Sequence, residues 1–220
     1  MRTRLKSLLI AILLLSLVEA PVFAAPSRAL GVITQADRAR LSSGDATSGA
    51  TVFDGDTLAT QSTGGLLVRL GEAQLYLLGN SAVTVRQLPS GVSSTLERGT
   101  AIFSSPSAEA FELRASEARI RAKTPGKLTY AQVTLAGPYE LVLTCQRGEL
   151  AVTIGEEVHA VLEATSYRVT IDAPTQAVQG SGAPPVATGR SRWKLIALIL
   201  IGAGTSFGVV YALLSPHRIF

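Results

Sequence analysis

The stretch "GDTLATQSTGGLLVRLGEAQLYLLGNSAVTV", residues 55–85, alternates apolar and polar residues, turns on glycine and asparagine, and then alternates again. It holds no histidine, no cysteine and only three charged residues. Val68 and Leu70 fall on one side of an extended chain and Leu67 and Arg69 on the other, as the two-residue period of a strand requires. The stretch therefore predicts short strands joined by tight turns, with few groups for chemistry.

The same pattern extends over residues 51–172, which we expect to form an all-β domain of about a dozen short strands. Each segment ends at glycine, proline, serine or a charged pair, and no window before residue 193 keeps the helical period. The expected architecture is a β-solenoid or twisted sheet, with a β-sandwich as the alternative. Residues 25–50 form a mixed lead-in, in which "ALGVITQA" is a candidate first strand.

Residues 1–24 have the features of a secretory signal peptide. Three basic residues precede an apolar run, and Val22 and Ala24 provide small residues for cleavage after Ala24. An uncleaved signal anchor is the alternative.

A second apolar segment lies near the other end of the chain. Residues 195–214 contain no charge in 20 positions, enough to span a bilayer, and Trp193 and Tyr211 suit its interfaces. We expect a transmembrane helix over 193–214, after a Pro/Gly-rich linker at 173–192 and before a short tail at 215–220. This predicts a single-pass protein of the bacterial inner membrane with a periplasmic β-domain. The alternative is a cytoplasmic domain, because three basic residues precede the anchor on its outer side (Arg190, Arg192, Lys194).

The positions of the charged residues, and the spacing of small residues in the predicted anchor, indicate which binding partners to expect. The net charge is +4, but residues 25–189 hold 13 basic and 15 acidic residues, so the basicity belongs to the membrane flanks and nucleic acid is not an expected partner. In the predicted anchor, Gly204, Gly208 and Ala212 recur every four residues on one helical face. Such a face favours close helix packing, and a homodimer through the anchor is one expectation.

Residues 53–154 contain an ordered set of turn and motif residues: Gly55, Asp56, Thr60, Gly64, Gly65, Gly71, Asn80, Ser81 and Gly99. The later part of the set is "LERGTAIF" at 96–103. Taken in order, these motifs resemble the FecR-like domain family, which is related to the ferric citrate uptake regulator. The resemblance implies an all-β, extracytoplasmic domain. The family's regulators carry a cytoplasmic anti-sigma segment, for which the six residues before the first apolar run leave no room.

Physical chemistry gives these residue types a structural role. Gly55 and Asp56 suit a tight turn, the Gly64–Gly65 pair suits a close approach or a bulge, and Asn80 suits a left-handed corner. Turn capping is the favoured interpretation of Asp54 and Asp56. A calcium site is the alternative, although two carboxylates are few for Ca²⁺.

Other reactive residues are sparse. Cys145 is the only cysteine, and its alternation with Leu141 and Leu143 indicates a buried filler. His159 is interpreted as an ordinary strand residue, and we expect no cofactor and no metal.

The favoured function is a non-catalytic, membrane-anchored scaffold that binds an envelope protein or the cell wall. The alternative is a transmembrane signalling regulator related to the anti-sigma regulators of iron uptake. An exported carbohydrate enzyme, with Glu156 and Glu157 among its carboxylates, is a third.

Overall fold

The computed structural model of the protein describes residues 28–137, 140–171 and 193–198. Within these residues every regular element is a β-strand, so the all-β prediction is confirmed. The strands, in chain order, are β1 (Ala29–Leu41), β2 (Gly44–Asp45), β3 (Thr51–Phe53), β4 (Thr57–Leu70), β5 (Ala73–Leu77), β6 (Ala82–Leu88), β7 (Gly91–Ser105), β8 (Phe111–Ala115), β9 (Ala118–Ala122), β10 (Thr129–Gly137), β11 (Glu140–Arg147), β12 (Leu150–Ile154), β13 (Glu157–Val161), β14 (Thr165–Ile171) and β15 (Trp193–Leu198).

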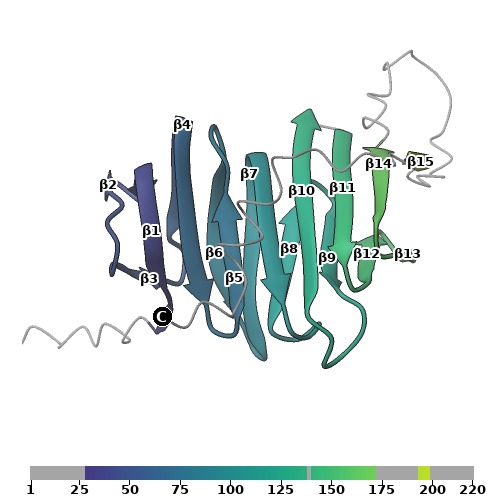
Figure 1. The fold of residues 1–220 in the computed structure, drawn as a ribbon, viewed down its shortest axis with the longest axis horizontal. Coiled ribbons are helices and arrows are strands. Elements are labelled where there is room, and N and C mark those ends of the chain that lie inside the picture. The colour runs from purple at the N-terminus through teal and green to yellow at the C-terminus, as the bar shows by residue number, and fades with distance from the viewer. Residues whose placement is uncertain (1–27, 138–139, 172–192, 199–220) are drawn as a thin grey trace, which may run out of the picture.

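These strands form one hydrogen-bonded sheet that folds over itself into two layers. The long strand β7 joins the layers, because its first half pairs with β6 and β8 and its second half pairs with β5 and β10. From β7, one layer continues through β10, β11 and β14 and the other through β8, β9, β12 and β13. Figure 1 shows the second of these layers behind the first. The sequence predicts a β-solenoid or twisted sheet, with a β-sandwich as the alternative. The two layers correspond to the β-sandwich.

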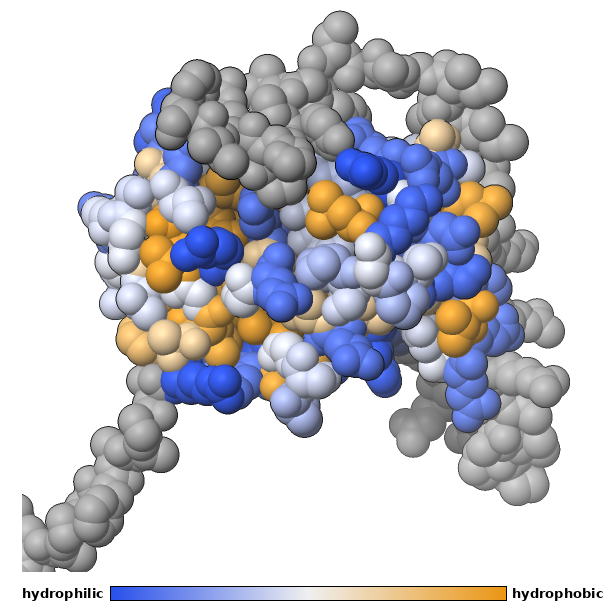
Figure 2. All heavy atoms as spheres, turned by 60° about the horizontal axis from the view of Figure 1, so that its bottom comes forward, coloured by the Kyte–Doolittle hydropathy of each residue, from blue (hydrophilic) through white to orange (hydrophobic). Residues whose placement is uncertain are grey.

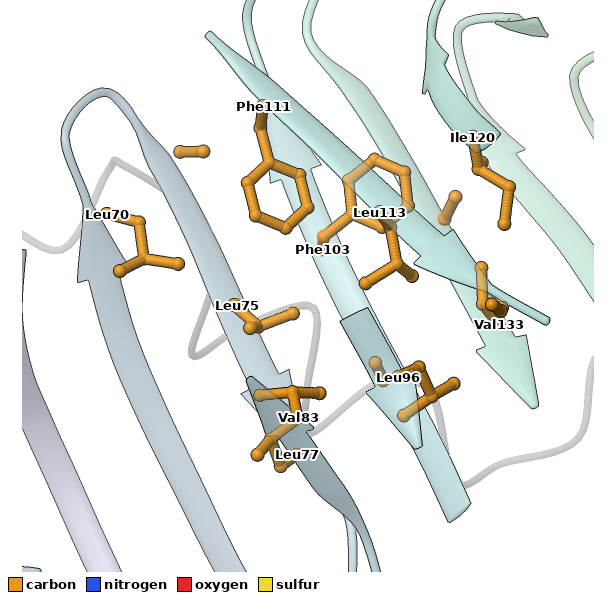
Figure 3. Packing of buried hydrophobic residues seen from close by; sticks show 14 of the residues in the cluster. Leu70, Leu75, Leu77, Val83, Leu96, Phe103, Phe111, Leu113, Ile120 and Val133 are labelled. Atoms are coloured by element: carbon orange, nitrogen blue, oxygen red, sulfur yellow. The ribbon is translucent and has the colours of Figure 1, made fainter. Parts of the chain in front are cut away.

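The hydrophobic core fills the space between the two layers. Phe103 of β7 and Phe111 of β8 meet there, with ring centroids 5.3 Å apart and ring planes inclined by 44°. Figure 3 shows Leu75, Leu113 and Val133 in the same packed cluster, although they come from three different strands. Because aromatic side chains bury large apolar areas, this contact between the layers is a main source of their cohesion.

The β-domain extends further towards the N-terminus than residue 51. Strand β1 lies in the segment expected to be a lead-in, yet it pairs with β4 along most of its length. Its Leu30 and Ile33 are buried in the core. Strand β1 is therefore an integral part of the sheet.

Strand β15 occupies the first six residues of the predicted transmembrane helix. It pairs antiparallel with β14, from Ser166↔Leu198 to Ile171↔Trp193. Over these six residues the backbone is extended and pairs along the edge of β14. None of the described residues belongs to a helix able to cross a membrane. The rest of the predicted helix lies outside the described residues.

Candidate functional site

Most of the family-type motif residues come together where β4 and β7 pass between the layers. We call this region the corner: residues 60–65, 78–81 and 98–100. Thr60 and Ser81 exchange hydrogen bonds there, with Thr60 N–Ser81 O at 2.9 Å and Ser81 N–Thr60 Oγ1 at 3.0 Å. Ser81 Oγ also donates to Thr100 O at 2.9 Å and accepts from Thr100 N at 2.8 Å. These polar side chains are buried and used by the fold.

Backbone crowding explains the glycines of the corner. Gly99 has φ +83°, and a Cβ atom there would lie 2.5 Å from Ser81 Oγ. At Gly64 a Cβ atom would lie 2.5 Å from the carbonyl oxygen of Arg38, which bulges from β1. At Gly65 it would lie 2.7 Å from the Tyr76 hydroxyl. At Gly64 and Gly99 the nearest atoms include backbone of a neighbouring segment, so only glycine fits without displacement of that backbone, whereas at Gly65 the Tyr76 side chain would have to move.

The remaining motif residues, Gly55, Asp56 and Gly71, lie in two turns. Gly55 and Gly71 have φ +87° and +58°, in the left-handed region. Asn80 of the corner adopts the same region, with φ +58°. The Asp56 carboxylate accepts hydrogen bonds from Ser42 Oγ at 2.7 Å and from Phe53 N at 2.8 Å.

Asp54, like Asp56, bonds to the backbone. Its carboxylate accepts a hydrogen bond from Gln87 N at 2.8 Å. Asp56 therefore caps its own turn through Phe53 N, as the turn-capping interpretation predicts, whereas Asp54 ties the turn to the backbone of β6. Within the described part of the chain, no three His, Cys, Asp or Glu residues gather as a metal site would need.

Cys145 and His159 carry the two most reactive side-chain types, and their environments differ. Cys145 is fully buried on β11 with Leu141 and Leu143, and burial, together with the charge of Glu163, raises the pKa of its thiol to about 12. The thiol is therefore protonated at neutral pH and packs as an apolar filler. His159 lies half-buried on β13, with Nε2 3.5 Å from the Glu157 carboxylate.

A charged cluster of a different kind lies on β8 and β9, on the outer face of their layer. Glu112 is 1 % exposed, and its carboxylate accepts hydrogen bonds from Arg114 Nε at 2.6 Å and Arg121 Nε at 2.5 Å. Burial raises the pKa of Glu112, but the hydrogen bonds and charges of the two arginines outweigh it and hold that pKa below its ordinary value. Glu112 is thus ionised and fixes both guanidinium groups.

Sequence reasoning missed this cluster, although a local signal for it exists. Ser116 and Glu117 form a two-residue turn between β8 and β9, and Ser116 has φ +53°. Such a turn fixes the hairpin register. The alternation in "FELRASEARIRA" then places Glu112 opposite Arg121 and Arg114 opposite Arg119, as the structure shows.

The surface offers a shallow pocket as well. It has a volume of about 370 Å³ and lies between the start of β1 and the turns that follow β4 and β6, with Arg28, Gly71 and Pro89 in its lining. On the face turned forward in Figure 2, hydrophobic residues lie in separate patches between hydrophilic ones. The pocket brings together no set of reactive side chains.

Several predicted elements fall outside the described residues. These are the signal peptide at 1–24, the linker at 173–192, the tail at 215–220 and the helix-packing residues Gly204, Gly208 and Ala212. They stay predictions from the sequence.

Comparison with protein-family models gave no match, and neither did comparison with curated proteins. Among solved structures, two crystal structures of a candidate anti-sigma factor from Parabacteroides distasonis, at 2.50 and 1.65 Å resolution, resemble this chain. Each has 12 % sequence identity and a TM-score of 0.45, over 64 % of this chain. The chain spans 59 % of the length of that protein.

Proposed function

We propose that the protein is a non-catalytic binding protein of the bacterial envelope, and that its β-domain offers the edge strand β13 to a protein partner. The proposal rests on the pairing of β13 and on the exposed apolar residues beside it. Among the described strands, β13 pairs only with β12. Two large apolar residues at this edge are exposed, Val158 by 66 % and Leu162 by 52 %.

An open edge presents backbone N–H and C=O groups that an extended segment of another chain can pair with. Backbone pairing supplies affinity, and neighbouring side chains supply specificity. Val158 and Leu162 would be covered by such a segment, which removes apolar surface from water.

The location and family belong to the same proposal and rest on the sequence. The predicted signal peptide and anchor place the domain in the periplasm, and the ordered motif from Gly55 to Gly99 supports a FecR-like domain.

A crosslinking experiment tests the proposal. A photoreactive residue is introduced at Leu162 of the full chain in its host, and a second version carries it at Phe53, an apolar residue 37 % exposed at the other end of the sheet. We expect a crosslinked protein partner from position 162 and none from position 53. Crosslinking should fall by about tenfold when Val158 is changed to lysine, which disfavours an apolar contact. Equal yields at both positions, or no product at 162, would refute the proposal.

A second candidate is transmembrane signalling as a relative of the anti-sigma regulators. The sequence resemblance to the FecR-like family favours it, and both structural neighbours are described as anti-sigma factors. Deletion of the protein would then change transcription that depends on a partner sigma factor. Unchanged transcription genome-wide, with the crosslink at position 162 retained, favours the scaffold.

A further inference from the structure

A row of polar side chains crosses the outer face of the layer that contains β6, β7, β8, β9 and β12. We call it the arginine row, and its members are Thr84, Thr95, Arg114, Arg119 and Thr153. Each member stands directly opposite the next on the neighbouring strand. With strands about 4.8 Å apart, the row is about 19 Å long. Its two charged members lie in the middle, with threonine on both sides.

The charges of the row are only partly balanced. Glu112 stands opposite Arg121, and both lie next to the arginine row. That single carboxylate binds Arg114 and Arg121. Arg119 forms no ion pair with any residue that the structure describes. At the other end of the row, the Glu97 carboxylate accepts a hydrogen bond from Thr84 at 2.5 Å. The three arginines and two glutamates therefore leave one positive charge on this face, next to Arg119.

The geometry of Arg114 and Arg119 is unfavourable on its own. They are directly opposed across two antiparallel strands, and like charges in this position repel each other. Arg114 is also held in place by Glu112, so it is less free to swing away. A bound anion between the two guanidinium groups turns this repulsion into attraction, because guanidinium binds a carboxylate through paired hydrogen bonds.

The surroundings of the pair select the kind of anion. Along the row the pair is flanked by short side chains, Thr95 beside Arg114 and Thr153 beside Arg119. These side chains are too short to line a deep pocket for the side chains of a peptide. The hydroxyls of Thr95 and Thr153, on either side of the pair, can donate and accept hydrogen bonds along a chain that lies across the strands. A polymer that carries both hydroxyl and carboxylate groups has the complementary chemistry.

We propose that the arginine row binds a carboxylate-bearing polysaccharide, with one uronate carboxylate between Arg114 and Arg119 and sugar hydroxyls against the neighbouring threonines. This site deepens the proposed envelope function, because export would bring it to such polymers. The row ends next to the edge of β13, because Thr153 stands opposite Val158. Arg119 lies on β9, with β12 between it and β13, so variants of Arg119 test the polysaccharide site without changing Val158 or Leu162.

The test measures binding of polygalacturonate to the purified full chain, with its methyl ester as the matched uncharged polymer. We expect binding of the acid form, weaker binding as salt rises, and at least roughly tenfold weaker binding of the ester, since the ester lacks the charge-assisted hydrogen bonds. Equal binding of acid and ester would overturn the proposal. Binding of poly-glutamate, or of phosphatidylglycerol vesicles, as tightly as polygalacturonate would also overturn it, in favour of an acidic peptide or a membrane.

Variants locate the site. Arg119→Gln should weaken binding by about tenfold, the effect of one lost charge-assisted pair. Arg69→Gln is the matched control, because Arg69 is an exposed strand arginine on β4, outside the arginine row, and it should leave binding unchanged. Thr153→Val keeps the branched shape but removes the hydroxyl, and should weaken polysaccharide binding without a change in salt dependence. Equal effects of the Arg119 and Arg69 variants would place binding elsewhere and refute the site.

Discussion

The corner and the arginine row use polar residues in opposite ways. At the corner, Ser81 is fully buried, and its hydroxyl is satisfied by Thr100. In the row, Arg119 is exposed and faces another arginine. Satisfied polar groups in the interior stabilise a fold, whereas an exposed repulsive pair contributes nothing to it and is better explained by a ligand. Mutations should therefore separate the two regions by their effect on stability.

The largest effect is expected from Gly99→Ala at the corner. The new Cβ atom would lie 2.5 Å from Ser81 Oγ and 2.6 Å from Asn80 O, at a φ of +83°. Steric displacement and backbone strain together should lower the free energy of unfolding by about 4 kcal/mol, measured by urea denaturation of the purified full chain.

Gly71→Ala provides the control for this substitution. Gly71 also has a positive φ, +58°, but a Cβ atom there meets nothing within 4 Å. Only the backbone strain applies, so the expected loss is about 1 kcal/mol. Equal losses in the two variants would contradict the crowding that we assign to the corner.

Ser81→Ala should have the next largest effect. It removes both hydrogen bonds to Thr100 and empties the fully buried position of the Ser81 hydroxyl, at a cost of about 2 kcal/mol, although Thr100 O keeps its bond from Leu78 N. Ser48→Ala is the comparison, since Ser48 Oγ makes an exposed hydrogen bond to Thr34 O at 2.9 Å. Its loss should be below about 0.5 kcal/mol. If urea denaturation gave the same loss for both, the Ser81 contacts would not matter as described.

Glu112→Gln tests how much the bonds between Glu112 and the two arginines, Arg114 and Arg121, contribute to stability. The variant loses charge-assisted hydrogen bonds to two arginines that are nearly half exposed, so we expect a loss of about 1.5 kcal/mol at neutral pH. The folded pKa of Glu112 is lowered, so its stabilisation is complete above the unfolded pKa of about 4.3 and is lost as pH falls through the lower folded value. The difference between wild type and variant should therefore shrink in acid.

The control for that pH dependence is Glu163→Gln. Glu163 is an exposed carboxylate whose pKa is lowered by hydrogen bonds from Lys127 and from the backbone N–H of Gly148. Solvent screens this pair, so the variant should show a smaller dependence on acid. A difference between wild type and Glu112→Gln that stayed constant from about pH 5 to about pH 2 would show that Glu112 is not ionised in the folded state.

The two regions also differ in how far sequence can predict them. Local conformation is encoded locally, so the turns at Gly55–Asp56 and Asn80 follow from residues that tolerate positive φ or cap a backbone. The meeting of Thr60, Ser81 and Gly99 depends on which strands pair, and no short-range pattern specifies it.

The pairing of β7 is the part of the fold that the sequence pattern predicts least. Its first half pairs in parallel with β8 and its second half antiparallel with β10. Alternation identifies which side of β7 faces the core, but not which neighbours it takes. The charged cluster is intermediate, because the two-residue turn at Ser116 and Glu117 fixes its register from sequence alone.

The smallest change in stability is expected from Arg119→Glu, which most sharply separates function from fold. It replaces the repulsion with Arg114 by a cross-strand ion pair, so the free energy of unfolding should rise by about 0.5 kcal/mol. Polygalacturonate binding should be lost, because the new carboxylate occupies the position of the ligand's own. Arg114→Glu, in contrast, should destabilise the fold, since it breaks the bond to the buried Glu112 and places two carboxylates on one strand. A clear loss of stability in Arg119→Glu would mean that Arg119 serves the fold, as the corner residues do, and that its repulsive position has another explanation.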